Sequence, residues 1–207
     1  MMVKAKGPVW HKKQKELNIL PSKLRGVDKE ATWSYSQTDR WIYGHGTYCE
    51  VSHETPVVLN FKWMRNCAHE AKVMSKCIRK YCSLIDYACM DSKADDIGLY
   101  KSLKIFSKIQ LLTSPRKNMN KTEERKKFIR IMNLSKHKKI YRRRSITVEP
   151  MQSLIKDIFD LEGCWMRGNK NNRWINAAMG IAVQMAQLDA WKEKRSTWKI
   201  KNEVLGV

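Results

Sequence analysis

The sequence contains no apolar run that approaches the roughly 20 residues needed to cross a bilayer. Its first residues, MMVKAKGP, lack the apolar stretch of a secretory signal peptide. None of the six cysteines forms a Cys-x-x-Cys pair, which argues against a zinc ribbon. We therefore expect no membrane partner and predict a cytoplasmic, nucleoid-associated location.

Acidic residues are scarce: 20 Asp and Glu stand against 41 Lys and Arg, which gives a net charge of +21. Residues 101–144 hold 16 Lys or Arg against only two acids, Glu123 and Glu124, a local net charge of +14. Such a field favours polyanions and gives salt-sensitive binding to phosphates. Nucleic acid is therefore the leading partner class. A basic structural or RNA-binding protein is the alternative.

One histidine and cysteine pattern invites a metal interpretation. His45, Cys49 and His53 are each separated by three residues. On a strand this spacing does not produce a tight metal site or a finger. We interpret the three as ordinary buried or half-buried residues.

The order of the expected elements is typical of an α/β fold. Runs of β-branched and aromatic residues predict strands, and apolar residues at helical spacing predict helices. The first two strands flank a turn at 37–39 and read as a hairpin. The expected strands are 33–36, 40–52, 56–61, 84–90 and 109–113, and the expected helices are 66–82, one after Asp96 with Leu99, Tyr100, Leu103 and Phe106 on its apolar side, 123–133, 149–161 and 172–193.

Two carboxylates stand where chemistry would be expected. Asp91 follows an apolar strand, and in open α/β sheets chemistry gathers beyond the carboxyl ends of strands. Glu149 opens a helix, and Lys156 lies two turns later on the same face. Carboxylates of this kind could hold Mg²⁺ while basic groups hold a DNA backbone. The structural alternatives are a helix cap for Asp91 and a solvent-facing pair for Glu149 and Lys156.

The stretch from Tyr141 to Pro150, followed by Lys156, resembles the Tyr…Arg…Glu…Lys signature of insertion-sequence DDE transposases. The Glu149-x6-Lys156 spacing matches that signature, and Arg144 fits some branches of the family. Tyr141 lies one residue farther from Glu149 than in the commonest form. Segments 5–11, 28–44, 89–96 and the helix after Arg167 also look like parts of this family.

The resemblance implies a ribonuclease-H-like fold, a mixed sheet with flanking helices. It would be incomplete at the N-terminus, with a basic insert at about 105–140 before the Glu-bearing helix. Residues 1–193 would form this partial catalytic domain, and 194–207 a C-terminal tail. Asp91 and Glu149 would be catalytic and would bind Mg²⁺ or Mn²⁺. The DNA-binding residues would be Tyr141, Arg142, Arg143, Arg144 and Lys156.

The expected partner is double-stranded DNA, at transposon ends and in the target, and the family allows a homodimer in the DNA complex. The family's first catalytic Asp should lie shortly before Ala5, but no acidic residue precedes Glu16. The first core strand should be missing with it. We therefore expect a truncated product with little or no activity alone. A non-catalytic DNA-binding remnant that regulates transposition is the competing hypothesis. For Trp165, base stacking and a core role are both open.

Overall fold

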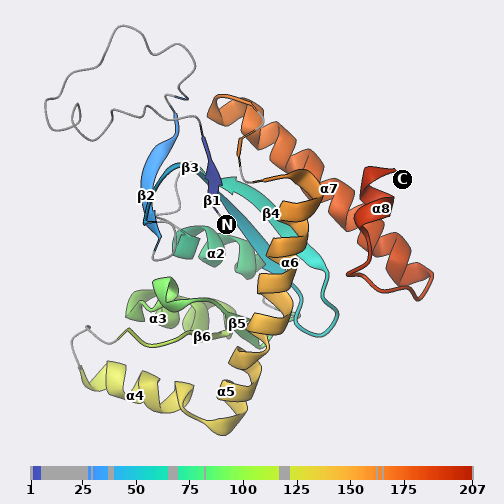
Figure 1. Cartoon of the computed structure of the whole chain (residues 1–207). Coiled ribbons are helices and arrows are strands. Elements are labelled where there is room, and N and C mark those ends of the chain that lie inside the picture. The colour runs from blue at the N-terminus through green and yellow to red at the C-terminus, as the bar shows by residue number, and fades with distance from the viewer. Residues whose placement is uncertain are drawn as a thin grey trace, which may run out of the picture. The chain divides into compact units, whose positions relative to one another are not determined.

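The computed structural model describes residues 2–5, 28, 30–36, 40–64, 70–81, 83–116, 122–161, 163–164 and 166–206 (Figure 1). The chain divides into two compact units. Unit 1 combines Met1–Ala68 with Met151–Val207, and unit 2 is His69–Pro150. Unit 1 is therefore discontinuous in sequence, with unit 2 inserted into it.

The sheet of unit 1 is built around one long strand, β3 (Arg40–Val51). Three strands pair with it in the antiparallel sense, namely β1 (Met2–Lys4), β2 (Thr32–Ser36) and β4 (Val58–Met64). The predicted hairpin of β2 and β3 and the predicted third strand are confirmed. The turn at 37–39 lies outside the described residues.

β1 approaches β3 at Gly44, and this approach depends on the absence of a side chain there. A Cβ on Gly44 would lie 2.1 Å from the carbonyl oxygen of Val3. Only glycine permits so close a contact between two backbones. The sequence suggested that a core strand ahead of Ala5 would be missing. That expectation is wrong, because Met2–Lys4 pairs residue by residue with β3.

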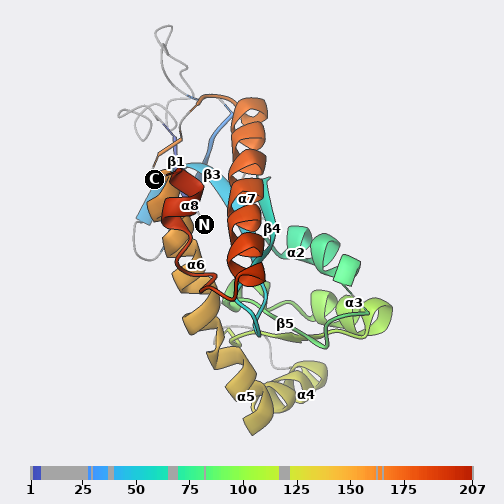
Figure 2. The same ribbon diagram turned by 90° about the vertical axis from the view of Figure 1, so that its right-hand side faces the viewer.

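Three helices complete unit 1: α6 (Arg144–Phe159), which enters the unit at Met151, α7 (Asn169–Lys192) and α8 (Lys201–Leu205). α7 runs alongside β4 (Figure 2). Apolar residues of β4 and these helices share one buried cluster, because α6 and α7 each turn an apolar face toward the sheet. The cluster comprises Val58, Met151, Ile155, Ile158, Phe159, Leu161, Met179, Val183, Ala186, Ala190 and Ile200.

A buried glutamine links the parts of unit 1. The side-chain oxygen of Gln187 accepts a hydrogen bond from the backbone N–H of Val58 at 2.8 Å. Its nitrogen donates to the carbonyl of Thr197 at 3.3 Å. Together with the buried Ile200, this bond places residues 194–207 within unit 1, where the sequence had suggested a separate tail.

Unit 2 contains a parallel two-stranded sheet of β5 (Tyr87–Cys89) and β6 (Gln110–Leu112), with α3 (Ile97–Ser107) between them in sequence. Parallel neighbours need such a crossover connection. Both predicted strands and the predicted helix are confirmed. The other elements are α2 (Glu70–Ile78), η2 (Arg79–Tyr81), η3 (Ser92–Ala94), α4 (Glu123–Met132) and α5 (Ser135–Arg142).

The structure differs from the sequence-based prediction for the helix that carries Glu149. α6 begins at Arg144, not at Glu149, so Pro150 lies inside the helix rather than in its first turn. Pro150 cannot donate the backbone hydrogen bond that an interior position normally makes. The division between the two units falls directly after this proline. A further helix, α5, lies between the predicted helices 123–133 and 149–161, where the sequence predicted no element.

A second correction concerns α3. The sequence placed Phe106 on its apolar side, but this side chain is exposed and lies under the guanidinium of Arg79, 5.6 Å from the ring centroid. The fold is thus a mixed α/β arrangement with one antiparallel and one parallel sheet. No helix in the described ranges is long and apolar enough to span a membrane.

Candidate functional site

Asp91 lies just past the end of β5, as predicted. The backbone N–H of Met90 still pairs with Leu112, so the ladder ends one residue before Asp91. The side chain of Asp91 then accepts a hydrogen bond from the backbone N–H of Lys93 at 2.9 Å and caps η3. The capping alternative is therefore correct for one carboxylate oxygen. No hydrogen bond reaches the other from any residue that the structure describes.

A buried ion pair holds the loop that carries Asp91. Asp95 ends η3, and both of its carboxylate oxygens accept hydrogen bonds from the guanidinium of Arg125, one of them at 2.9 Å. Both side chains are almost fully buried. These hydrogen bonds raise the pKa of Arg125, which stays charged. Arg125 belongs to α4, so the ion pair fastens the basic helix to the Asp91 loop.

Arg116 adds a second attachment to the same loop. Its guanidinium donates to the carbonyl of Ser92 at 2.6 Å and to that of Lys93 at 2.7 Å. Its backbone N–H donates to Asp95 at 2.5 Å. Two arginines from the basic part of unit 2 thus hold the backbone of η3 and the Asp95 side chain that follows it. We call Asp95, Arg116 and Arg125 the arginine clamp.

Tyr141, Arg144 and Glu149 come together at the corner between α5 and α6. Arg144 donates to a carboxylate oxygen of Glu149 at 2.9 Å. The same guanidinium lies 5.7 Å from the centroid of the Tyr141 ring. Glu149 therefore pairs with Arg144, and the predicted solvent-facing pair with Lys156 is replaced by a shorter contact on the helix.

Electrostatic interactions connect this corner to the end of β5. Burial raises the pKa of Tyr141, and the negative charge of Asp91 raises it further. The positive charge of Arg144 and a hydrogen bond from the Ser114 backbone oppose this rise. Burial also raises the pKa of the Cys89 thiol to about 11, again opposed by Arg144. Tyr141 and Arg144 thus lie close enough to β5 to share a field with Asp91. Asp91 and Glu149 are thus connected only indirectly, through Tyr141 and Arg144.

α5 is held against β5 by aromatic contacts. The ring of His137 lies 5.6 Å from that of Tyr87, and the ammonium of Lys136 lies 5.4 Å from the Tyr87 centroid. The His137 imidazole also hydrogen-bonds the carbonyl of Ile131 at 2.7 Å. These contacts explain why the end of α5, with Tyr141, reaches the end of β5.

The remaining predicted DNA contacts are exposed. Arg142 and Arg143 project from the turn between α5 and α6, and no described residue bonds to either side chain. Lys156 is also exposed, two turns after Glu149 on α6, and it belongs to unit 1. The structure therefore groups Asp91, Tyr141, Arg144 and Glu149 in one unit, but assigns Lys156 to the other.

Two carboxylates can supply the protein ligands of one hard cation, but they are too few for a pair of cations. Among the described residues, no group of three His, Cys, Asp or Glu side chains could hold a metal ion. Mg²⁺, however, is commonly bound by one or two carboxylates that are completed by substrate phosphates and water. Asp91 and Glu149 each keep one carboxylate oxygen free of described partners, as a ligand of such an ion requires. They do not by themselves supply a complete two-metal site.

Unit 1 contains a separate buried polar cluster around Asp28. Its carboxylate accepts hydrogen bonds from the backbone N–H groups of Gly168, at 2.9 Å, and Glu30, at 3.0 Å, and contacts the imidazole of His45 at 3.1 Å. Burial alone would raise the pKa of Asp28, but these hydrogen bonds outweigh it and lower the pKa. His45 thus bonds a carboxylate and lies against the ring of Trp63.

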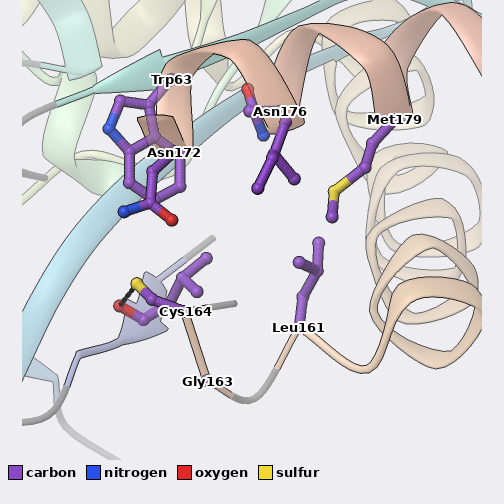
Figure 3. Close-up of a pocket in the computed structure, with 9 residues that line it drawn as sticks. Trp63, Leu161, Gly163, Cys164, Asn172, Asn176 and Met179 are labelled. Atoms are coloured by element: carbon purple, nitrogen blue, oxygen red, sulfur yellow. Dashed lines mark hydrogen bonds between the residues drawn. The ribbon is translucent and has the colours of Figure 1, made fainter. Parts of the chain in front are cut away.

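The cavity beside this cluster is too small for a substrate. It has room for about one water molecule and lies between the start of α7 and the segment around Cys164 (Figure 3). Trp63, Asn172 and Met179 point toward it. Trp165, for which stacking on DNA and a core role were both open, lies outside the described residues. The candidate site therefore remains the one in unit 2.

Comparison with models of protein families, with curated proteins and with solved structures finds no match. The function of this chain is therefore inferred from its own residues. The arginine clamp is what the sequence did not predict. The acidic residues between positions 91 and 96 suggested a basic partner. No local pattern indicated which arginine, some 30 residues later, would pair with Asp95.

Proposed function

We propose that this chain is the catalytic segment of a DDE-type DNA transposase that acts on phosphodiester bonds of double-stranded DNA. One observation carries the proposal: Asp91 and Glu149, far apart in sequence, are linked within unit 2 through Tyr141, which lies in the field of Asp91, and Arg144, which lies beside the Tyr141 ring and bonds to Glu149. The resemblance of the sequence to this family supplies the reaction class. A ribonuclease-H-like arrangement of the sheets is part of the same proposal.

The two carboxylates would hold Mg²⁺ or Mn²⁺ together with a phosphate oxygen of the substrate. When bound, the ion would polarise the phosphodiester and lower the pKa of an attacking water or 3′-hydroxyl. Asp91 offers an oxygen while its other oxygen stays bonded to the Lys93 backbone. The clamp on η3 would keep that carboxylate in place as DNA binds.

Arg144 has two alternative partners in this mechanism. Without DNA its guanidinium is bonded to Glu149, in a pair of which Glu149 is more than half exposed. Exposed pairs of this kind contribute about 0–1 kcal/mol, so a DNA phosphate can compete for the guanidinium. Transfer of Arg144 to the phosphate would free Glu149 to bind the cation. DNA binding and assembly of the metal site would thereby be coupled.

The exposed basic residues would contact the DNA backbone. Arg142 and Arg143 lie at the end of α5, just before Arg144, and Lys156 lies on α6. Contacts to phosphates carry no sequence information, so they would position DNA rather than select a site. A cytoplasmic, nucleoid-associated location follows from this partner.

A second candidate function is a non-catalytic DNA-binding regulator of transposition. Two observations favour it: the described residues contain no group of three metal ligands, and Glu149 is engaged by Arg144. This candidate shares the DNA contacts with the first and differs only in the absence of metal-dependent cleavage. A homodimer on DNA is compatible with both.

The test combines a binding assay with a cleavage assay. The purified chain is titrated against labelled duplex DNA between about 50 and 200 mM salt, where about four phosphate contacts predict a loss of affinity of about 100-fold. It is then incubated with supercoiled plasmid and Mg²⁺ or Mn²⁺. Nicking that disappears in both Asp91→Asn and Glu149→Gln, but persists in Glu123→Gln, supports the transposase.

The outcomes separate the candidates. Salt-dependent binding without nicking favours the regulator. Weak, salt-insensitive binding to duplex DNA contradicts both, as does RNA that outcompetes DNA strongly. Glu123 is a suitable control because it is an exposed acid of unit 2 whose partner, Lys126, lies on the same helix.

A further inference from the structure

α7 is apolar on two opposite faces, and only one of them is covered. Residues such as Met179, Val183 and Ala190 face the core of unit 1. The opposite face, which we call the α7 stripe, exposes large apolar side chains to solvent. Its members and their exposed fractions are Trp174 (72%), Ile181 (56%), Met185 (66%), Leu188 (51%) and Trp191 (61%).

Most of the stripe, from Trp174 to Leu188, is also free of charge. No Asp, Glu, Lys or Arg occurs from Trp174 to Leu188, although charged residues make up 29% of the chain. Charges occur toward the two ends of α7, with Lys170 and Arg173 before the stripe, Asp189 between Leu188 and Trp191, and Lys192 after it. An uncharged apolar face cannot form ion pairs with DNA phosphates. Contiguous exposed apolar surface of this kind marks a protein contact.

The part of the stripe from Trp174 to Leu188 is symmetric about Ile181, whereas Trp191 lies beyond this part. Trp174 and Leu188 are each seven residues from Ile181, so the three lie on one line along the helix. Ala177 and Met185 are each four residues from Ile181, on opposite sides. If two such helices pack antiparallel across an axis at Ile181, Trp174 meets Leu188 and the small Ala177 meets the large Met185. The surface is thus complementary to itself, as an isologous contact requires.

We infer that two copies of this chain associate through the α7 stripe, with their α7 helices antiparallel. The five large side chains expose apolar surface on the order of 600 Å² per copy, which approaches the roughly 800 Å² per partner of a standard interface. A second copy is the appropriate occupant because two chains of charge +21 can approach each other with less local repulsion across a face that carries no Lys or Arg between Trp174 and Leu188. The inference concerns unit 1 alone and holds whether or not the chain is a transposase.

The test measures the oligomeric state by sedimentation equilibrium at about 0.5 M salt, where the Debye length falls to a few ångströms and charge repulsion is screened. The wild-type chain is expected to dimerise with a dissociation constant of about 1–10 µM. Ile181→Glu brings two carboxylates together at the axis and is expected to weaken the dimer at least 100-fold. Leu188→Arg should act in the same direction.

The matched control is Ile105→Glu, which adds the same charge at another exposed isoleucine, on α3 in unit 2. It should dimerise as the wild type does. Circular dichroism verifies that each variant is folded, as expected for substitutions at exposed positions. A wild-type chain that is monomeric at about 100 µM overturns the inference. So does a dimer that Ile181→Glu and Leu188→Arg leave unchanged, or one that Ile105→Glu weakens equally.

Discussion

Replacing Arg125 with methionine removes the cation from its buried pair with Asp95 and keeps most of the side-chain volume. The Asp95 carboxylate would then stay buried, with only the backbone N–H of Arg116 as a described donor. Breaking a buried pair by removing one partner costs about 3–5 kcal/mol, because an uncompensated charge remains in a medium of low dielectric constant. We expect unit 2 to lose stability by that amount.

The assay is urea denaturation of the whole chain, followed by circular dichroism, for a complete double-mutant cycle. The double variant Asp95→Leu with Arg125→Met leaves no buried charge, so it should recover most of the lost stability. Lys126→Met is the matched control. This lysine neighbours Arg125 on α4, and its pair with Glu123 is exposed, so its removal should cost less than about 1 kcal/mol.

Two results would refute this reasoning. The first is a loss of less than about 1 kcal/mol in Arg125→Met, which would mean that water reaches the pair. The second is additivity in the cycle, which would mean that the two side chains act independently. A large coupling energy, in contrast, would establish that α4 stabilises the loop of Asp91 through this one contact.

Three further predictions follow from other contacts. Arg144→Met should weaken binding to duplex DNA about 5-fold and reduce the slope of affinity against salt by about 1 in fluorescence anisotropy, whereas Lys199→Met should not. Asp28 has a lowered pKa in the folded chain, so its contribution to stability is complete above the ordinary pKa of 3.8 and is lost as pH falls through the folded value. Denaturation curves of Asp28→Asn should therefore show a smaller loss of unfolding free energy between pH 5 and acid than those of the wild type. An equal loss would contradict the assignment. Gly44→Ala should destabilise unit 1 by several kcal/mol in the same assay, because the new Cβ would overlap the Val3 carbonyl; a loss within about 0.5 kcal/mol would show that β1 can move away.

Local patterns in the sequence predicted much of the fold. The hairpin of β2 and β3 was predictable because aromatic and β-branched residues flank a polar turn. β5, with Asp91 directly after it, was predictable because a short apolar run ends at an acid. The helix after Asp96 was predictable as well, and its cap is the Asp96 side chain, which accepts from the N–H of Leu99 at 2.7 Å.

What the sequence could not show depends on contacts between distant residues. α5 is so rich in Lys and Arg that its apolar positions hardly stand out, although both residues favour helices. The partner of Asp95 could not be chosen among the many arginines of the basic stretch. The start of α6 was placed too late because Pro150 suggested a first turn, whereas the helix tolerates it in its interior. In each case, tertiary packing determines a local structure or a pairing that the propensity of the sequence alone does not specify.

The insertion of unit 2 into unit 1 has a consequence for synthesis on the ribosome. β4 needs α7 to complete its core, and the bond between Val58 and Gln187 spans 129 residues. Residues 69–150 leave the ribosome as one continuous stretch well before α7 has been made. Unit 2 can therefore fold while the first segment of unit 1 still waits for its partner. During that interval the long β3 strand lacks the helices that bury its unit's core, so a pause in translation before α7 would be the period of greatest risk of aggregation.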